Sequence, residues 1–544
     1  MEGLMMETQL TIPELIVSRA ERYFAHRPVV SRVGDIVHRS TWGEVTRRAQ
    51  LLAGALRSLG VRPGDRVGTF AWNTHRHLEA YLGVPSMGAV LHTLNIRLFA
   101  EQVAYIVDHA DDKLVLCDRS LLPAWRSVEP LLSRRRPLVV LPDVDDASDG
   151  GDAADYESLL AAATPLQWPQ IDENSAAAMC YTSGTTGHPK GVVYSHRSTV
   201  LHAFATGLAD ANAISSRDVL LAIVPMFHAN SWGLPYSSSM LGTSLVLPGR
   251  DLSPQAICSL IESERVTIAG GVPTIWLAVL EHWRRARPDL SSLRVAICGG
   301  SAVPAALSAA FETEVGVPIL QAWGMTETSP IGTVARLPVE TGDDPDEQTR
   351  RSYACSQGRA VPGVDLRVVD EAGDEVPRDG KTMGEIQVRG PWIARAYYKD
   401  ESGDDKFSDG WLRTGDVATI DELGYVRIAD RTKDLVKSGG EWISSVELEG
   451  HLMAHPDVLE AAVIAVPDAK WDERPLACVV LRPEARGRMS EADLVEHLRP
   501  RVAKWWLPDR VVFIDEVPKT SVGKFDKKQL RARYSEVTAE ATTR

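Results

Sequence analysis

The stretch from Tyr181 to Ser195 reads YTSGTTGHPKGVVYS and constrains the fold more than any other part of the chain. It is too irregular for a regular helix or strand. The apolar run at 176–181, AAAMCY, leads into it and suits a buried strand, and Ser195 can cap a helix that begins immediately afterwards. We therefore expect a loop that joins a strand to a helix.

The composition of this loop suits the binding of an anion. Glycines allow positive φ and bring backbone N–H groups close to an anion, while hydroxyl side chains add donors. It is not the usual P-loop, because Pro189 stands where that motif needs its second glycine and Gly191 where it needs Ser or Thr. Taken alone, a short Gly/Thr loop is more often an ordinary surface turn. The candidate phosphate-binding residues are Thr182, Ser183, Gly184, Thr185, Thr186, Gly187 and Lys190.

Composition and charge exclude several classes of protein. The chain has 544 residues, 44% of them apolar and 24% charged, which is typical of a globular protein with a large core and more than one domain. The formal charge of −14 argues against nucleic acid as a partner. No stretch approaches the ~18 apolar residues of a membrane span, so we expect no integral membrane segment. Peripheral contact with a membrane stays open for a lipid-like substrate.

Cysteine usage and the N-terminus indicate the compartment. The six cysteines are scattered and form no CxxC pair, so neither a zinc site nor a disulfide framework is indicated. The first residues, MEGLMMETQLTIPEL, contain early acids and no apolar core of signal-peptide length. These features predict a cytoplasmic protein.

Short apolar runs alternate with helical patterns through most of the chain. Thr41 and Glu44 form a potential capping box at the start of one such helix. The alternation predicts parallel α/β layers. From Gly384 the pattern turns to alternating β, which predicts a small β subdomain, and the last ~110 residues suit a compact α+β domain. The main strand candidates lie at 65–70, 113–118, 293–298 and 317–322.

Five motifs now carry a resemblance to a known family. The Gly/Thr loop, QAWGMTE, RTGD, DRTKD and PKTSVGK follow one another as they do in the AMP-forming adenylate superfamily, which the chain resembles over essentially its whole length. That family includes acyl-CoA synthetases, nonribosomal-peptide adenylation domains and firefly-type luciferases. The resemblance implies an α/β fold with a large N-terminal domain, residues 1–432, built of layered α/β subdomains plus a β subdomain. A small mobile α+β lid domain, residues 433–544, would follow, with its hinge at Lys433.

The resemblance also assigns catalytic and nucleotide-binding roles. Lys524, which ends PKTSVGK, is the predicted catalytic lysine, and Glu327 and Thr182 are predicted catalytic residues and ligands of Mg²⁺. Asp416 can accept hydrogen bonds from ribose hydroxyls, and Arg431 can donate to ribose or phosphate oxygens. Taken alone, these residues would suit surface ion pairs or a solvated basic run. Further predicted ATP and AMP contacts are Gly300, Ser301, Ala302, Gln321, Ala322, Trp323, Gly324, Met325 and Thr326.

Two further segments resemble substrate-binding parts of the family. PMFHANSW at 225–232 is similar to a segment that borders the acyl tunnel, with Trp232 as its gate, although an aromatic segment of this kind also suits a protein core. The predicted acyl pocket consists of His228, Trp232, Gly299, Gly300 and Trp323. The predicted coenzyme A channel consists of Lys437, Gly439, Gly440, Glu441 and Trp442.

The implied activity is a two-step ligation that uses ATP, Mg²⁺ and coenzyme A. A small-molecule carboxylic acid would react with ATP to give an acyl-adenylate, which coenzyme A then converts to acyl-CoA. The motifs are most similar to those of bacterial medium- and long-chain fatty acyl-CoA synthetases. Open alternatives are a ligase for a short or thioether acid such as 3-methylmercaptopropionate, one for an aryl acid, and an enzyme that passes its adenylate to a carrier protein or oxygen. A non-catalytic acyl-adenylate-binding protein is disfavoured by Glu327 and Lys524. A homodimer also stays open.

Overall fold

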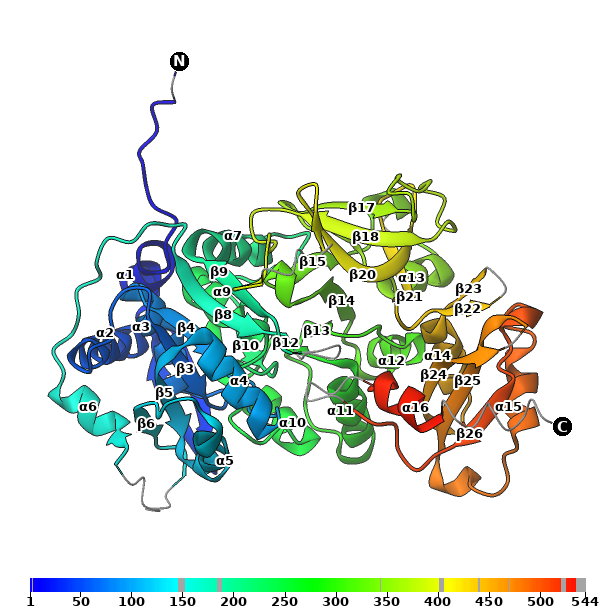
Figure 1. The fold of residues 1–544 in the computed structure, drawn as a ribbon, viewed down its shortest axis with the longest axis horizontal. Coiled ribbons are helices and arrows are strands. Elements are labelled where there is room, and N and C mark those ends of the chain that lie inside the picture. The colour runs from blue at the N-terminus through cyan, green and yellow to red at the C-terminus, as the bar shows by residue number, and fades with distance from the viewer. Residues whose placement is uncertain are drawn as a thin grey trace.

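The computed structural model of the chain contains four sheets within its described residues (Figure 1). These residues are 1, 3–144, 152–182, 188–342, 344–400, 406–438, 441–468, 470–519 and 525–534. The seven-stranded sheet lies at one end of the molecule and the small C-terminal domain at the other, with the β subdomain along one side (Figure 1).

A nine-stranded sheet forms the centre of the large domain, in the order β16-β15-β14-β13-β12-β10-β11-β1-β2. Its inner strands run parallel and are almost entirely apolar, as in Val295–Cys298, because helices cover both faces of such a sheet. The strands are β1 (Pro28–Val33), β2 (Ile36–Thr41), β10 (Val219–Ala222), β11 (Ser244–Leu247), β12 (Ile268–Gly271), β13 (Val295–Cys298), β14 (Ile319–Gly324), β15 (Ile331–Val334) and β16 (Arg359–Ala360). The associated helices are α7 (His196–Gly207), α8 (Ala229–Trp232), α9 (Leu234–Leu241), α10 (Pro254–Ser263), α11 (Pro273–Ala286), α12 (Ala305–Ala310) and α13 (Glu347–Ala354).

The seven-stranded sheet has the order β7-β6-β5-β3-β4-β8-β9. Its strands are β3 (Arg66–Phe70), β4 (Val90–Thr93), β5 (Asp112–Asp118), β6 (Leu138–Leu141), β7 (Ala154–Asp155), β8 (Ala176–Tyr181) and β9 (Gly191–Ser195). The helices of this part are α1 (Ser18–Phe24), α2 (Trp42–Ser58), α3 (His75–Ser86), α4 (Ala100–Ala110), α5 (Leu122–Val128) and α6 (Tyr156–Ala162). The predicted strands at 65–70, 113–118, 293–298 and 317–322 are confirmed as β3, β5, β13 and β14, and the Thr41–Glu44 capping box opens α2.

One predicted connection is wrong. The Gly/Thr loop joins two antiparallel strands, β8 and β9, rather than a strand to a helix. Ser195 does cap a helix, because its side chain accepts a hydrogen bond from the N–H of Ser198 at the start of α7, but β9 intervenes. The apolar residues Val192 and Val193 support this extra strand, since β-branched side chains favour extended backbone.

The β subdomain and the small domain complete the chain. The subdomain contains β17 (Asp365–Val369), β18 (Gly384–Arg389), β19 (Phe407–Ser408), β20 (Trp411–Ile420) and β21 (Val426–Arg431). The small domain contains β22 (Val436–Ser438), β23 (Glu441–Ile443), β24 (Val458–Asp468), β25 (Asp472–Leu481), β26 (Arg510–Phe513), α14 (Ser445–Met453), α15 (Glu491–Leu498) and α16 (Lys527–Tyr534). Single turns of 3₁₀ or π type occur at Ile12–Val17, Arg119–Leu121, Glu129–Leu131, Phe311–Val315, Thr326–Thr328, Val339–Thr341, Pro483–Ala485 and Lys504–Trp506.

The cores confirm a large and a smaller domain. The main core packs α2 and α3 between the two large sheets and includes the fully buried rings of Trp42, Tyr81 and Tyr156. The small domain has apolar clusters of its own, one of which contains Leu448 and Val479. A separate core is what allows such a domain to move as a unit. Within the described ranges, no helix combines the length and apolar character needed to cross a membrane.

Candidate active site

The carboxyl ends of β12, β13 and β14 meet at one edge of the nine-stranded sheet. The N–H of Gly299, directly after β13, faces the carbonyl oxygen of Gly271 at 3.4 Å. The N–H of Val303 donates to the side-chain oxygen of the buried Gln321 at 3.0 Å, which ties the segment 299–302 to β14. Between them Gly300 has φ +87°, and Ser301 and Ala302 are exposed. Ligands of parallel sheets collect at such an edge.

The neck of the predicted phosphate loop is closed by hydrogen bonds. The N–H of Thr182 donates to the carbonyl oxygen of Lys190 at 2.9 Å, and the N–H of Lys190 donates to Thr182 Oγ1 at 3.1 Å. His188 stacks on Tyr105 of α4, with 4.5 Å between ring centroids. The structure therefore holds both ends of the loop, while the predicted contacts Ser183, Gly184, Thr185, Thr186 and Gly187 lie outside the described residues.

Trp323, Asp416 and Arg431 form a connected row between β14 and the β subdomain. The indole N–H of Trp323 donates to Asp416 Oδ2 at 2.9 Å, and Arg431 Nε lies 3.1 Å from Asp416 Oδ1. Asp416 is 4% exposed, and its charge raises the pKa of Arg431. A carboxylate oxygen can accept more than one hydrogen bond, so both oxygens of Asp416 remain able to accept a ribose hydroxyl.

Glu327 is buried close to this row and is held by several groups. The hydroxyl of Tyr397 donates to Glu327 Oε1 at 2.5 Å, and the ammonium of Lys406 lies 4.0 Å from the same oxygen. The hydroxyl of Tyr194 donates to the carbonyl oxygen of the preceding residue, Thr326, at 2.8 Å. No group of three or more His, Cys, Asp or Glu side chains suited to a metal occurs in the part of the chain that the structure describes. One carboxylate fits Mg²⁺ that takes its other ligands from phosphates and water.

The predicted acyl-pocket residues separate into two places. Ala229, Asn230, Ser231 and Trp232 all have positive φ, and this left-handed turn brings Trp232 to the end of β13. A Cβ on Gly299 would lie 3.2 Å from the Trp232 ring and 2.9 Å from the carbonyl oxygen of Ala322, so only glycine fits between them. His228 is half-buried just before this turn. Trp323 instead packs in the core of the β subdomain.

The small domain places part of the predicted coenzyme A channel in a hairpin. Lys437 pairs with Trp442 across β22 and β23, and Trp442 is half-buried. Burial lowers the pKa of Lys433, the predicted hinge residue. Gly439, Gly440, Lys524 and the side chain of Glu441 lie outside the described residues. The ends of the loop that carries Lys524 are close together, because the N–H of Asp526 donates to the carbonyl oxygen of Pro518 at 2.7 Å.

Sequence reasoning missed the residues that hold Glu327 and Lys190. Lys190 Nζ lies 3.0 Å from Asp400 Oδ2 and 4.8 Å from the ring centroid of Tyr397. The only available signal was the dense polar and aromatic run AYYKD at 396–400, directly after a β pattern. Its partners stand 70 and 210 residues away in sequence, at Glu327 and Lys190.

Comparison with known proteins extends this geometry to the whole chain. The family model for the AMP-binding enzyme matches residues 17–398, and that for the AMP-binding enzyme C-terminal domain matches residues 447–524. The chain belongs to the AMP-binding enzyme family. The two models fall on the large and the small domain, in that order.

Relatives of this AMP-binding enzyme are named as CoA ligases for different acids. The chain is 47% identical to the long-chain-fatty-acid–CoA ligase of Thermus thermophilus, over 97% of this chain and 96% of that protein. It is 44% identical to the 3-methylmercaptopropionyl-CoA ligase of Ruegeria lacuscaerulensis, over 98% of this chain and 99% of that protein. It is 43% identical to the medium-chain-fatty-acid–CoA ligase of Ectopseudomonas oleovorans, over 99% of this chain and 98% of that protein.

Solved structures agree with the fold of the AMP-binding enzyme. The anthranilate CoA ligase AuaEII in complex with anthranoyl-AMP has a TM-score of 0.86 and 27% identity, covering 98% of this chain and 99% of that one. ATP-bound MatB from Rhodopseudomonas palustris has a TM-score of 0.82 and 28% identity, covering 97% and 100%. The chain is thus an enzyme of the acid–thiol ligase class, with the predicted large and small domains.

Proposed function

We propose that this AMP-binding enzyme activates a medium- or long-chain fatty acid as its acyl-adenylate and transfers the acyl group to coenzyme A. The observation that carries the nucleotide part is the meeting of Glu327, Lys190 and the Trp323–Asp416–Arg431 row around one edge of the large domain. A metal-binding carboxylate, a phosphate-binding lysine and a ribose acceptor are what ATP requires.

In the first step, a carboxylate oxygen of the acid attacks the α-phosphorus of ATP, and the bond to the bridging oxygen breaks to release pyrophosphate. The attack of one anion on another needs positive charge and donors at the phosphates. Lys190 is the proposed contribution of the large domain, and Lys524 is that of the lid. Bound Mg²⁺, with Glu327 and Thr182 as its proposed protein ligands, would supply further positive charge.

In the second step, the sulfur of coenzyme A attacks the acyl carbon, the thiol proton leaves to solvent, and AMP departs. The residues we assign to the coenzyme A channel are on the hairpin of β22 and β23, in the small domain. A domain movement about Lys433 would withdraw Lys524 and bring this hairpin to the adenylate. No covalent intermediate with the enzyme is needed.

The placement of Trp232 supports a gated acyl tunnel. Its ring lies next to two glycines, Gly270 and Gly299, where any larger residue would fill the space beside it. The ring is only half-buried, which is compatible with movement when a chain enters. Relatives of both substrate classes match the chain at 43–47% identity, so a second candidate is a short thioether acid such as 3-methylmercaptopropionate.

Coenzyme-A-dependent AMP release distinguishes these candidates. The acids are the even-numbered series from butyrate to palmitate, together with 3-methylmercaptopropionate and benzoate. Each methylene buried in an apolar tunnel contributes about 0.8 kcal/mol, so kcat/KM should rise by about fourfold per carbon until the tunnel ends. An optimum at four carbons or fewer, or on 3-methylmercaptopropionate, would contradict the proposed substrate. No activity with any acid would contradict the ligase function as a whole.

A further inference from the structure

The segment 397–400 connects the two charged groups that the proposed function places next to ATP. Tyr397 contacts Glu327, and Asp400 contacts Lys190. We propose that Tyr397 and Asp400 are positioning residues, which orient the Glu327 carboxylate for a divalent cation and hold the Lys190 ammonium until phosphate replaces Asp400. This inference rests on the proposed function, because it assumes that the site binds a metal–nucleotide complex.

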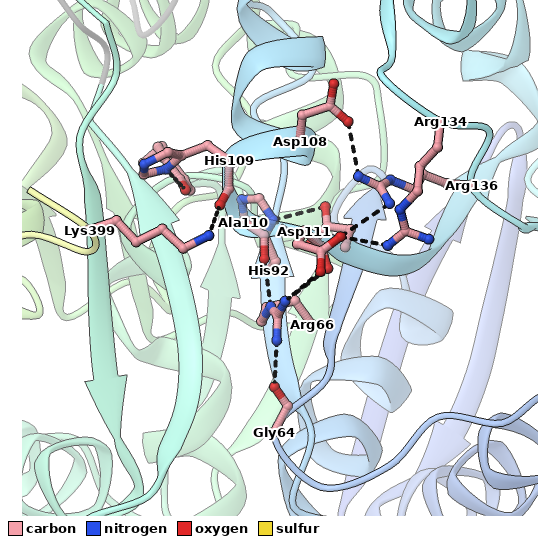
Figure 2. A network of polar contacts seen from close by, with 12 residues as sticks. Gly64, Arg66, His92, Asp108, His109, Ala110, Asp111, Arg134, Arg136 and Lys399 are labelled. Carbon is pink, nitrogen blue, oxygen red and sulfur yellow. Dashed lines mark hydrogen bonds and ion pairs between the residues drawn. The ribbon is translucent and has the colours of Figure 1, made fainter.

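The segment is anchored on both sides, so it can position other groups. The N–H of Tyr398 donates to the carbonyl oxygen of Gly191 at 2.8 Å, at the first residue of β9. Lys399 Nζ donates to the carbonyl oxygen of His109 at 3.0 Å, at the end of α4 (Figure 2). Tyr398 and Lys399 thus anchor the segment, and Tyr397 and Asp400 flank them on either side.

The end of α4 is itself fixed by a network of charged groups. Arg66 Nε donates to the carbonyl oxygen of Ala110 at 2.6 Å, and Arg134 lies 2.5 Å from Asp111 on the other side (Figure 2). The buried Arg136 reaches Asp108 at 2.9 Å. The contact of Arg66 satisfies one of the last carbonyl groups of the helix, which otherwise lack partners, and the other two join the side chains of Asp111 and Asp108. Lys399 is therefore attached to a helix end that Arg66 ties to β3 of the seven-stranded sheet.

Tyr397 restricts the orientation of Glu327. Both residues are buried, and the short hydrogen bond of 2.5 Å joins the phenol to only one of the two carboxylate oxygens. The backbone of Glu327 is held as well, since the N–H of Ala394 donates to its carbonyl oxygen at 2.8 Å. A buried carboxylate with one oxygen occupied presents the other in a defined direction, which lowers the entropy lost when a cation binds.

Asp400 holds Lys190 by a contact that phosphate can replace, whereas Tyr397 holds Glu327 permanently. The two side chains form an ion pair of 3.0 Å and are 19% and 40% exposed, respectively. Such a partly exposed pair contributes little free energy and is easily exchanged. The ammonium also lies over the face of the Tyr397 ring, which favours a cation without competing for its hydrogen bonds. Phosphate can then replace Asp400 while the ring keeps the lysine in place.

Two conservative variants separate these roles. Tyr397→Phe keeps the ring under Lys190 but removes the hydroxyl that holds Glu327, so it should weaken binding of the cation and spare the nucleotide. Asp400→Asn keeps the size of the side chain but removes the charge that competes with phosphate, so it should strengthen nucleotide binding. A merely structural role would weaken both kinds of binding or neither.

The experiment measures binding rather than turnover, with the full-length chain. Mn²⁺ binding to the complex with α,β-methylene-ATP is followed by electron paramagnetic resonance, and binding of α,β-methylene-ATP without metal is followed by calorimetry. Loss of a hydrogen bond to a charged group should raise the Kd for Mn²⁺ about tenfold in Tyr397→Phe. Loss of a partly exposed ion pair should lower the Kd for the nucleotide about threefold in Asp400→Asn.

Tyr398→Phe is the matched control, because this neighbouring ring packs edge-on to His109. It should leave both dissociation constants within twofold of the parent. An unchanged Mn²⁺ affinity in Tyr397→Phe would overturn the role of Tyr397, and unchanged or weaker nucleotide binding in Asp400→Asn would overturn that of Asp400. Failure of the ligase proposal would appear elsewhere, as a parent protein that binds nucleotide but forms no adenylate with any acid.

Discussion

The nucleotide side of the large domain and the junction with the small domain use polar groups in different ways. On the nucleotide side, Asp416 is held by Trp323 and Arg431, and Glu327 by Tyr397, all within the large domain. At the junction, Asp430 near the end of β21 accepts a hydrogen bond of 2.7 Å from the N–H of Ser445 in the small domain. The nucleotide side is thus assembled within the large domain, whereas the junction joins the large domain to the small one.

Charged groups of the small domain surround this contact. Lys527 of α16 lies 2.6 Å from Glu449 of α14 and donates to Ser445 Oγ at 2.5 Å. Ser445 in turn donates through its hydroxyl to Asp430. On the next turn of α16, Arg531 pairs with Asp434, one residue past the proposed hinge, at 2.8 Å. Lys527 stands three residues after the proposed catalytic Lys524.

This difference matches the work that we propose for each region. Hydrogen bonds and ion pairs within one body keep the nucleotide site in one geometry through both proposed steps of the reaction. Buried ion pairs define an orientation but contribute little net stability, because desolvation offsets their attraction. At the junction itself, Ser445 of the small domain contacts Asp430 of the large domain, and the Lys527–Glu449 pair supports Ser445 from within the small domain, which suits a contact that fixes the lid in one orientation and still releases it.

The largest effect should come from breaking the junction. Above pH 7, where Glu449 is ionised, Lys527→Ala would leave the carboxylates of Glu449 and Asp430 buried without their cation, which should destabilise the small domain by about 3–5 kcal/mol. Denaturant unfolding, monitored with a signal from the small domain, measures this change in the free energy of unfolding. Lys528→Ala, at the exposed neighbouring position, should change the free energy of unfolding by less than about 0.5 kcal/mol. Equal effects of the two variants would show that the buried contacts carry no special weight.

The next effect should come from the nucleotide side. Asp416→Asn removes the charge that pairs with Arg431 and weakens acceptance of the ribose hydroxyls, so the KM for ATP should rise about tenfold. The protein should remain folded. Asp365→Asn, which alters an exposed ion pair with Arg389 in the same sheet, is the control and should change KM less than twofold. A similar KM in both variants would remove Asp416 from the site.

A smaller effect concerns pH at the junction. Burial raises the pKa of Glu449 from 4.5 to about 7, so the folded protein retains a proton that the unfolded chain releases. Its contribution to stability is therefore complete below about pH 4.5 and is lost as pH rises through 7. Lys527 and Asp430 are the charged groups that face it. Relative to Glu449→Gln, the parent should lose about 1 kcal/mol per pH unit between pH 5 and 7. If the free energies of unfolding of the parent and of Glu449→Gln changed in parallel with pH, this prediction would be refuted.

The smallest effect should come from Trp323. Trp323→Phe keeps most of the ring volume and removes the N–H that donates to Asp416, so the KM for ATP should rise about threefold. Preference among acids of different length should stay the same. Trp232→Ala should have the opposite pattern: kcat/KM should change across the acid series, and the KM for ATP should not change. A shift of acid preference in Trp323→Phe would show instead that Trp323 takes part in the acyl pocket.

The fold was predictable because its signals are local. The runs that become β3, β5, β13 and β14 are apolar segments of strand length, and the Thr41–Glu44 capping box depends on residues three apart. The short strand β9 was missed because Gly191–Ser195 follows a glycine-rich loop without a break and reads as its continuation.

The candidate site was predictable only as far as its motifs reach. Glu327, Asp416 and Arg431 stand in recognisable sequences, whereas Tyr397, Asp400 and Lys406 act through contacts with residues distant in the chain. The preference of Trp323 for Asp416 also depends on tertiary packing, because β14 and β20 are 93 residues apart at this point. Such pairings follow from topology and not from local pattern.

In the mechanism we propose, one nucleotide site serves two half-reactions and the lid separates them. This mechanism is tested most directly by measuring both half-reactions in Lys524→Ala: acid-dependent ATP–pyrophosphate exchange without coenzyme A, and thioester formation from a supplied acyl-adenylate. We expect exchange to fall about 10²–10³-fold, because one donor to the developing charge is lost, while thioester formation stays near that of the parent. Equal loss in both half-reactions would contradict it.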